Sequence, residues 1–126
     1  MTMAALGVIF AHSVAEKDWS GVAKLLHPDI DFRAMTPNRV WDGANPAEVL
    51  ATLDTWFEVG DVIESVESVE SDAFVDRERV GYRFRVRNDN GLHEVEQQAY
   101  LSVTDGQISW LRIMCSGFRL VPDKRD

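Results

Sequence analysis

The sequence predicts a single α+β domain in which helices come first and a sheet of long antiparallel strands follows. Apolar residues recur at helical spacing within the first 60 residues. From residue 61 onward, β-branched residues and glycine turns dominate. Helices followed by a run of strands are typical of α+β folds. The length of 126 residues matches one ordinary domain, so we expect one unit over residues 1–126.

Two helices are expected at the start of the chain. Four apolar residues recur there at helical spacing: Met3, Leu6, Phe10 and Val14. They predict a largely buried first helix. This apolar run has no basic start and is too short to span a bilayer, so we do not interpret it as a signal peptide or membrane anchor. Asp18 is a good N-cap for a second helix, which Pro28 ends.

The third helix has the clearest sequence signals. Asn45 is a good N-cap, Pro46 suits the first helical position, and Glu48 completes a capping box. Gly60 is expected to end this helix. A loop carrying Trp41 is expected just before it.

Five strands are expected, over residues 30–35, 62–70, 79–87, 92–103 and 107–120. Residues 62–70 space their apolar residues by three and four, which also fits a helix. We favour a strand because valine, isoleucine and serine dominate this segment. Glycine turns join the last three strands into a meander.

Composition excludes several classes of function. The formal charge of −8 and the pI of about 4.8 repel phosphate backbones, so nucleic acid is not an expected partner. A lone cysteine, Cys115, forms no internal disulfide or thiolate metal site and suits a reducing, cytoplasmic compartment. The three histidines lack metal-ligand spacing, and no metal or other cofactor is expected.

Four segments resemble, in order and spacing, the nuclear-transport-factor-2-like superfamily, which includes SnoaL-like cyclases and ketosteroid isomerases. They are residues 18–19, 25–32, 41–43 and 105–108, and the resemblance covers nearly the whole chain. It implies a cystatin-like α+β cone, in which a curved antiparallel sheet wraps around three N-terminal helices and encloses an apolar pocket. It also implies a homodimer through the sheet.

The resemblance and the aromatic content together predict the residues that line the pocket and bind substrate. These are Phe10, Phe32, Trp41, Trp56, Tyr82, Gln98, Tyr100, Leu111, Ile113 and Cys115. Aromatic residues at such positions are more often ordinary core than ligand contacts, except Trp41, whose loop position suits a rim. Gln98 and Tyr100 would orient a ligand carbonyl or hydroxyl, or make a structural hydrogen bond.

The same resemblance argues against ketosteroid isomerase activity. That chemistry needs a carboxylate base, a tyrosine hydroxyl and a protonated acid that converge on one carbonyl. The positions that match them hold Ala34, Phe10 and Gln98.

Two residues are candidates for acid–base chemistry. If the polar side of residues 92–103 faces inward, Glu96 lies in an apolar cavity, where a carboxyl group is a natural general acid or base. In the alternative orientation Glu96 lies on the outer face, opposite an arginine of the preceding strand. His12 would shuttle protons if it met Glu96, or is a surface histidine. Alternation alone leaves the orientation open.

Two main functions follow from these expectations. The leading hypothesis is an enzyme that isomerises, cyclises or dehydrates a small hydrophobic oxygenated molecule, such as a polyketide, terpenoid or steroid-like compound. The alternative is a non-catalytic binding module or a dimerising scaffold whose cone is filled by its own side chains.

Overall fold

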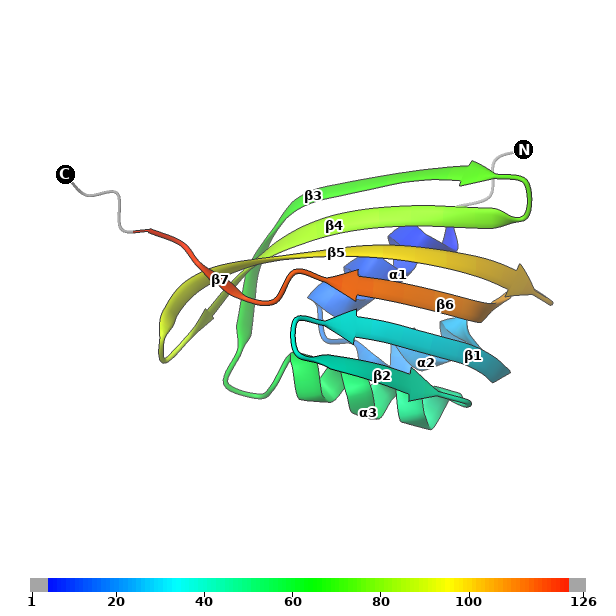
Figure 1. The fold of residues 1–126 in the computed structure, drawn as a ribbon, viewed down its shortest axis with the longest axis horizontal. Coiled ribbons are helices and arrows are strands. Elements are labelled where there is room, and N and C mark those ends of the chain that lie inside the picture. The colour runs from blue at the N-terminus through cyan, green and yellow to red at the C-terminus, as the bar shows by residue number, and fades with distance from the viewer. Residues whose placement is uncertain (1–4, 123–126) are drawn as a thin grey trace.

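The computed structural model describes residues 5–122 (Figure 1). The elements, in chain order, are α1 (Leu6–Ala15), α2 (Trp19–Leu25), β1 (Leu26–Thr36), β2 (Arg39–Gly43), α3 (Pro46–Trp56), β3 (Val62–Phe74), β4 (Arg77–Asn88), β5 (Gly91–Thr104), β6 (Gln107–Cys115) and β7 (Arg119–Leu120).

The helices begin at the predicted caps. The Asp18 carboxylate accepts the backbone N–H of Gly21 at 3.0 Å. Asn45 accepts the N–H of Glu48 at 3.0 Å, and Pro46 opens α3. The described part of α1 begins at Leu6, and Met3, which was expected in this helix, lies outside the described residues. The helix α3 ends at Trp56, four residues before the predicted stop.

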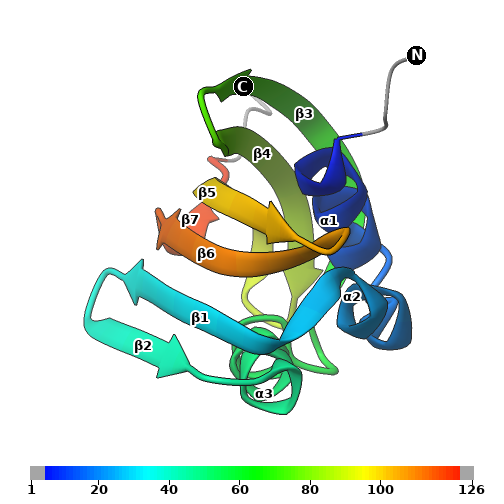
Figure 2. The same ribbon diagram turned by 90° about the vertical axis from the view of Figure 1, so that its right-hand side faces the viewer.

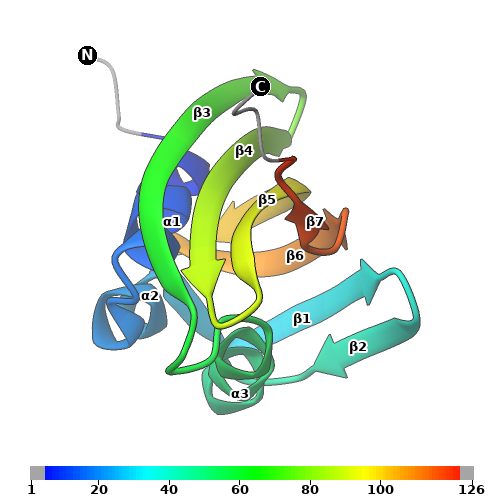
Figure 3. The same cartoon turned by 90° about the vertical axis from the view of Figure 1, so that its left-hand side faces the viewer.

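All strands belong to one sheet in the order β2-β1-β6-β5-β4-β3, with β7 paired to β5. The sheet bends so that the three helices lie against one side of it (Figures 2 and 3). We call the side toward the helices the inner face and the opposite side the outer face. The helix α1 packs on β3 and β4, and α3 packs on β1 and β2.

The α+β class is confirmed, but the sheet is mixed. The strands β1 and β6 run parallel, from Leu26↔Ile108 to Met35↔Met114. A helix and the whole meander separate these strands in the chain, so local sequence patterns do not reveal that they pair. Pro28 lies within β1, where the pairing register is interrupted, which is a position that tolerates proline in a sheet.

Two further boundaries differ from the sequence expectation. The expected loop around Trp41 is the strand β2, which pairs with the end of β1. The expected strand over residues 107–120 is split into β6 and β7 by residues 116–118. The ambiguous segment that begins at Val62 is a strand, as predicted.

The core fills the space between the inner face and the helices. Its fully buried side chains include Phe10, Phe32, Leu53, Phe84 and Leu111. Burial of rings and branched chains of this size supplies most of the favourable free energy of folding. No helix among the described residues is long and apolar enough to cross a membrane.

Candidate functional site

Among its buried side chains, the inner face of β5 carries one polar residue in an otherwise apolar row. Val95, Ala99 and Leu101 are buried, and so is Gln97, which is only 1% exposed. Because side chains of a strand alternate between faces, residues 96, 98 and 100 point to the outer face. Gln97 therefore occupies the inward position that the sequence analysis gave to its neighbours.

Gln97 is held by Tyr82, its cross-strand partner on β4. The Tyr82 hydroxyl donates to Gln97 Oε1 at 2.6 Å. Burial raises the pKa of Tyr82, so its hydroxyl keeps its proton at any ordinary pH and stays a donor. The amide Nε2 of Gln97 then has no hydrogen-bond partner among the described residues.

A second unpartnered donor belongs to Trp56, the last residue of α3. Its Nε1 is buried and has no acceptor within the described chain. Its ring lies 6.5 Å from Phe32 and meets Trp41 edge to face at 6.1 Å. A buried donor without an acceptor lowers the stability of the fold by about 1–3 kcal/mol. Buried polar groups are normally paired, so two unpaired donors in one small core require an explanation.

Four core residues keep small exposed fractions: Ala34 at 5%, Ile113 at 3%, Cys115 at 7% and Trp56 at 9%. Ala34 and Ile113 also border the hollow of the outer face that is described below. Ala34 pairs with Ile113, and Cys115 pairs with Gln97, so three of them lie on adjacent strands. We call the region around these four residues the mouth.

Several predicted pocket residues do lie in the interior. Seven of them are buried: Phe10, Phe32, Trp56, Tyr82, Leu111, Ile113 and Cys115. Trp41 is half-buried and packs against Trp56, with its Nε1 donating to Thr36 Oγ1 at 2.9 Å. Their contact with a ligand stays a prediction.

Glu96 does not point into the interior, so the expectation of an enclosed carboxylate is corrected. Its side chain is 37% exposed on the outer face, and Arg83 Nε donates to its Oε1 at 2.7 Å. Glu96 also accepts a hydrogen bond from Gln98. The bond from Arg83, and to a lesser extent the bond from Gln98, lowers the pKa of Glu96 below its ordinary value. The alternative orientation of the sequence analysis is therefore the observed one.

Three other predicted residues also lie away from the interior. Gln98 and Tyr100 share the outer face with Glu96, and Gln98 accepts a hydrogen bond from Arg79 and donates one to Glu96. His12 is exposed on α1. The predicted inward residues were 96, 98 and 100, whereas residues 95, 97, 99 and 101 point inward. A shift of one residue along a strand moves every side chain to the opposite face of the sheet.

Sequence reasoning missed two residues, Gln97 and Glu78. Gln97 would have been found if the side of β5 that carries Val95, Ala99 and Leu101 had been taken as the buried side. Glu78, near the start of β4, accepts the N–H of Gly7 at 3.1 Å at the beginning of α1. Burial raises the pKa of Glu78 above its ordinary value. No sequence pattern marks this contact, because the two residues are far apart in the chain.

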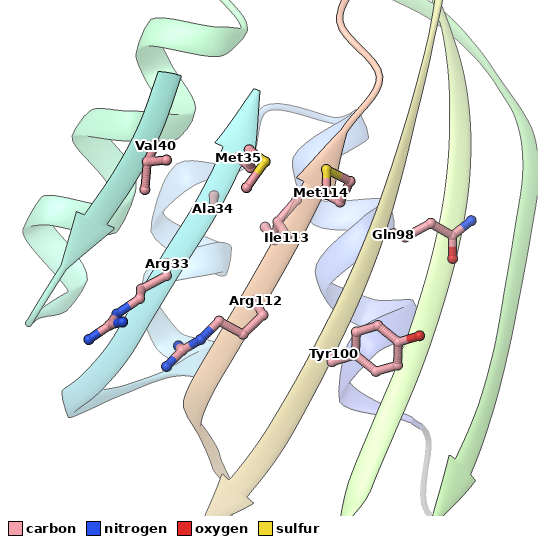
Figure 4. A pocket seen from close by; sticks show the side chains of 9 residues that line it. All are labelled: Arg33, Ala34, Met35, Val40, Gln98, Tyr100, Arg112, Ile113 and Met114. Carbon is pink, nitrogen blue, oxygen red and sulfur yellow. The ribbon is translucent and has the colours of Figure 1, made fainter. Parts of the chain in front are cut away.

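The outer face carries an apolar hollow of about 370 Å³ over β2, β1, β6 and β5 (Figure 4). Its lining residues are Arg33, Ala34, Met35, Val40, Gln98, Tyr100, Arg112, Ile113 and Met114. Met35, Val40 and Met114 are all exposed. Other surface hollows have volumes of 250 to 400 Å³, and none of those described is lined by Gln97 or Trp56.

The interior supplies hydrogen-bond donors and lacks an acid–base pair. Among residues 5–122, Thr52 and Gln97 are the buried polar residues, and Tyr82, Trp56 and Cys115 add a buried hydroxyl, indole N–H and thiol. No carboxylate or imidazole of this part of the chain is fully buried. No group of three or more histidine, cysteine or acidic side chains in it is arranged to hold a metal ion.

Comparison with known proteins shows the fold. No family model and no curated protein matches the sequence. A provisionally named isomerase from Rhodopseudomonas palustris has a TM-score of 0.75 at 12% identity, over 92% of this chain and 93% of its own. A provisionally named SnoaL-like polyketide cyclase from Mesorhizobium loti has a TM-score of 0.64 at 18% identity, over 90% and 98%. An LEH-like epoxide hydrolase from M. tuberculosis has a TM-score of 0.64 at 12% identity, over 88% and 80%.

Proposed function

From the premise that this chain has the SnoaL-like cone fold, we propose that it binds a small, neutral, apolar molecule that carries a hydrogen-bond acceptor, such as a ketone oxygen. The unpartnered Nε2 of Gln97, held in place by Tyr82, is the observation that carries this proposal. An acceptor on a ligand would satisfy this donor, and the surrounding rings would bury the ligand's apolar part.

The interior favours binding over acid–base chemistry. Glu96 and His12, the residues expected to move protons, lie outside it, and Gln97 and Trp56 do not titrate. A general base must reach the proton that it removes, and no carboxylate or imidazole among the described residues is fully buried. The imidazole of His93, on the same side of β5 as Gln97, is half-buried against Phe118. The binding module is therefore the hypothesis that the geometry supports best.

A matched pair of glutamines tests this proposal. Prodan, a neutral naphthyl ketone whose fluorescence reports a dry environment, is titrated into the protein and displaced with acetylnaphthalene or ethylnaphthalene. Gln97→Leu is expected to weaken binding of the two ketones about tenfold and to leave ethylnaphthalene unchanged, as loss of one hydrogen bond requires. Gln98→Leu, on the outer face, is the control and should change neither.

The proposal is wrong if the protein, with its fold verified by circular dichroism, binds none of these compounds. It is also wrong if Gln97→Leu and Gln98→Leu weaken binding of the ketones equally. Equal weakening of ketone and hydrocarbon by Gln97→Leu would show that this residue shapes the interior and does not recognise an acceptor.

A specific observation also supports the expected homodimer through the sheet. The hollow of the outer face exposes Met35, Val40 and Met114 side by side, and flexible apolar side chains of this kind are common at interfaces. Arg33, beside them, forms no ion pair within the described residues. In a two-fold dimer a second copy presents the same apolar residues, so the two faces match each other.

Light scattering during gel filtration tests the dimer. Met114→Glu places a charge at the centre of the apolar hollow and is expected to give a monomer. Val59→Glu, in the exposed loop after α3 and outside the lining of the hollow, is the matched control and should leave the mass unchanged. A wild-type protein that is monomeric at all accessible concentrations would contradict the proposal.

A further inference from the structure

A short loop interrupts the edge of the sheet at the mouth. The strands β6 and β7 both pair with β5. The last pair of β6 is Gln97↔Cys115, and the first residue of β7, Arg119, pairs with Glu94. Residues 116–118 between them leave the ladder (Figure 1). We call these three residues the mouth loop.

The mouth loop closes the space between β6 and the turn that joins β1 to β2. Gly117 lies so close to Pro37 that a Cβ atom at residue 117 would be 2.8 Å from Pro37 Cγ. Gly117 also has a φ of +79°, a conformation that glycine adopts without a steric penalty. The sequence therefore allows this close approach only with glycine at this position.

Phe118 forms the inner wall of the mouth loop. Its ring centroid lies 5.9 Å from that of Phe57, the residue that follows Trp56, and 5.9 Å from the ring of His93. It is half-buried against the core. The ring thus packs on the core at Phe57, three residues after Cys115 in the chain.

Few interactions hold the mouth loop shut. Ser116 donates its N–H to Glu96 O at 2.9 Å, and its Oγ accepts the N–H of Glu96 at 3.0 Å. Gly117 donates its N–H to Cys115 Sγ at 3.4 Å. The strand β7 has only two residues, both exposed. Segments with few buried contacts and short ladders open locally at a much lower free-energy cost than the whole domain.

We propose that the mouth loop is the entrance to the interior and that Phe118 is the side chain that controls passage through it. Opening moves the Phe118 ring off Phe57 and separates Gly117 from Pro37. It exposes Cys115 and the donor of Gln97 without disturbing the strands β1 and β4 to β6. The inference rests on the proposed binding function, because an entrance matters only for a site that takes a ligand.

The single cysteine gives a direct measure of opening. Cys115 is buried, so its reaction with dithionitrobenzoate reports how often the mouth opens. For local opening, the labelling rate in the native protein should hardly change as urea is added at low concentration. If labelling requires global unfolding, the rate should rise with the same urea dependence as the equilibrium unfolding constant.

Phe118→Ala is expected to raise the labelling rate without urea about tenfold, because it removes two ring contacts. Phe74→Ala is the matched control, since Phe74 is an exposed phenylalanine in the distant hairpin between β3 and β4, and it should leave the rate unchanged. If Phe118→Ala does not fold, Ser116→Ala serves in its place, because it removes the Oγ that anchors the mouth loop to β5.

The proposal is overturned if wild-type labelling follows global unfolding, or if the mouth-loop variant labels no faster than Phe74→Ala. These results need no ligand, so they are independent of the Prodan titration. Local opening without Prodan binding would refute the binding function and leave only a mobile loop. Prodan binding without faster labelling in the variant would keep the binding function and move the entrance elsewhere.

Discussion

Tyr82 and Gln97 face each other across β4 and β5, and the tyrosine hydroxyl donates to the amide oxygen at 2.6 Å in a fully buried position. This bond satisfies the hydroxyl and fixes the amide so that its nitrogen is the free end. Both the fold's stability and the proposed recognition of an acceptor depend on it.

Tyr82→Phe is expected to lower the free energy of unfolding by about 1–3 kcal/mol, because the Gln97 amide would then be buried with neither end paired. Urea denaturation measures the change. Tyr100→Phe is the matched control, since Tyr100 is exposed on the outer face, and it should cost less than about 0.5 kcal/mol. Equal losses in the two variants would contradict the structural role of the hydroxyl.

The double variant Tyr82→Phe with Gln97→Leu is expected to be more stable than Tyr82→Phe alone. Replacing both partners of a buried hydrogen bond by apolar groups of similar shape leaves no unsatisfied group behind. The measurement is a double-mutant cycle in urea, with a coupling free energy of about 1–2 kcal/mol expected. Additive effects would mean that the two side chains do not interact in solution.

Glu96→Gln is expected to change stability only slightly and in a pH-dependent way. The pKa of Glu96 is lowered in the folded state, so its ion pair with Arg83 stabilises the protein above the ordinary pKa of 4.5. That stabilisation is lost as the pH falls through the folded-state pKa. Because the side chain is partly exposed, the difference near neutral pH should not exceed about 1 kcal/mol.

Urea unfolding of the two proteins near neutral and near acidic pH checks this expectation. The difference between wild type and variant should shrink toward zero in acid. The Prodan titration should be identical for both, since Glu96 lies on the outer face. A large loss of Prodan binding in Glu96→Gln would show that Glu96 contributes to the binding site after all.

The local signals in the sequence predicted the helices well. Asp18 and Asn45 act as caps within a few residues of their own position, so the chemistry that starts α2 and α3 is readable without the fold. The segment that begins at Val62 was ambiguous in its periodicity, and its β-branched content predicted the strand correctly. The order of the elements predicted the SnoaL-like fold.

Features that depend on distant partners were not predictable in the same way. The parallel pairing of β1 with β6 joins segments about 80 residues apart, as in Asp31↔Trp110. The orientation of β5 was the decisive uncertainty, because alternation left both rows possible and the candidate site residues belonged to the polar row with Glu96, which faces outward. Burial of the apolar set is the stronger physical rule, and it holds here.

Glu78→Gln is expected to stabilise the protein near pH 7, by less than about 1 kcal/mol because the side chain is only partly buried. Burial raises the pKa of Glu78, so the folded state holds this proton more tightly than the unfolded state does. Stability therefore falls as the pH rises from the ordinary value of 4.5 through the folded-state pKa.

Glutamine carries no charge, and its Oε1 still accepts the N–H of Gly7, so the variant avoids this loss and keeps the bond that wild type makes at 3.1 Å. Urea unfolding of both proteins between about pH 4 and pH 7 measures the difference, which should vanish at the acidic end. Glu48→Gln, an exposed acid at the start of α3, is the control for removing a charge near a helix start. If Glu78→Gln is less stable near pH 7, attraction between the Glu78 charge and the amino end of α1 outweighs the cost of burying it.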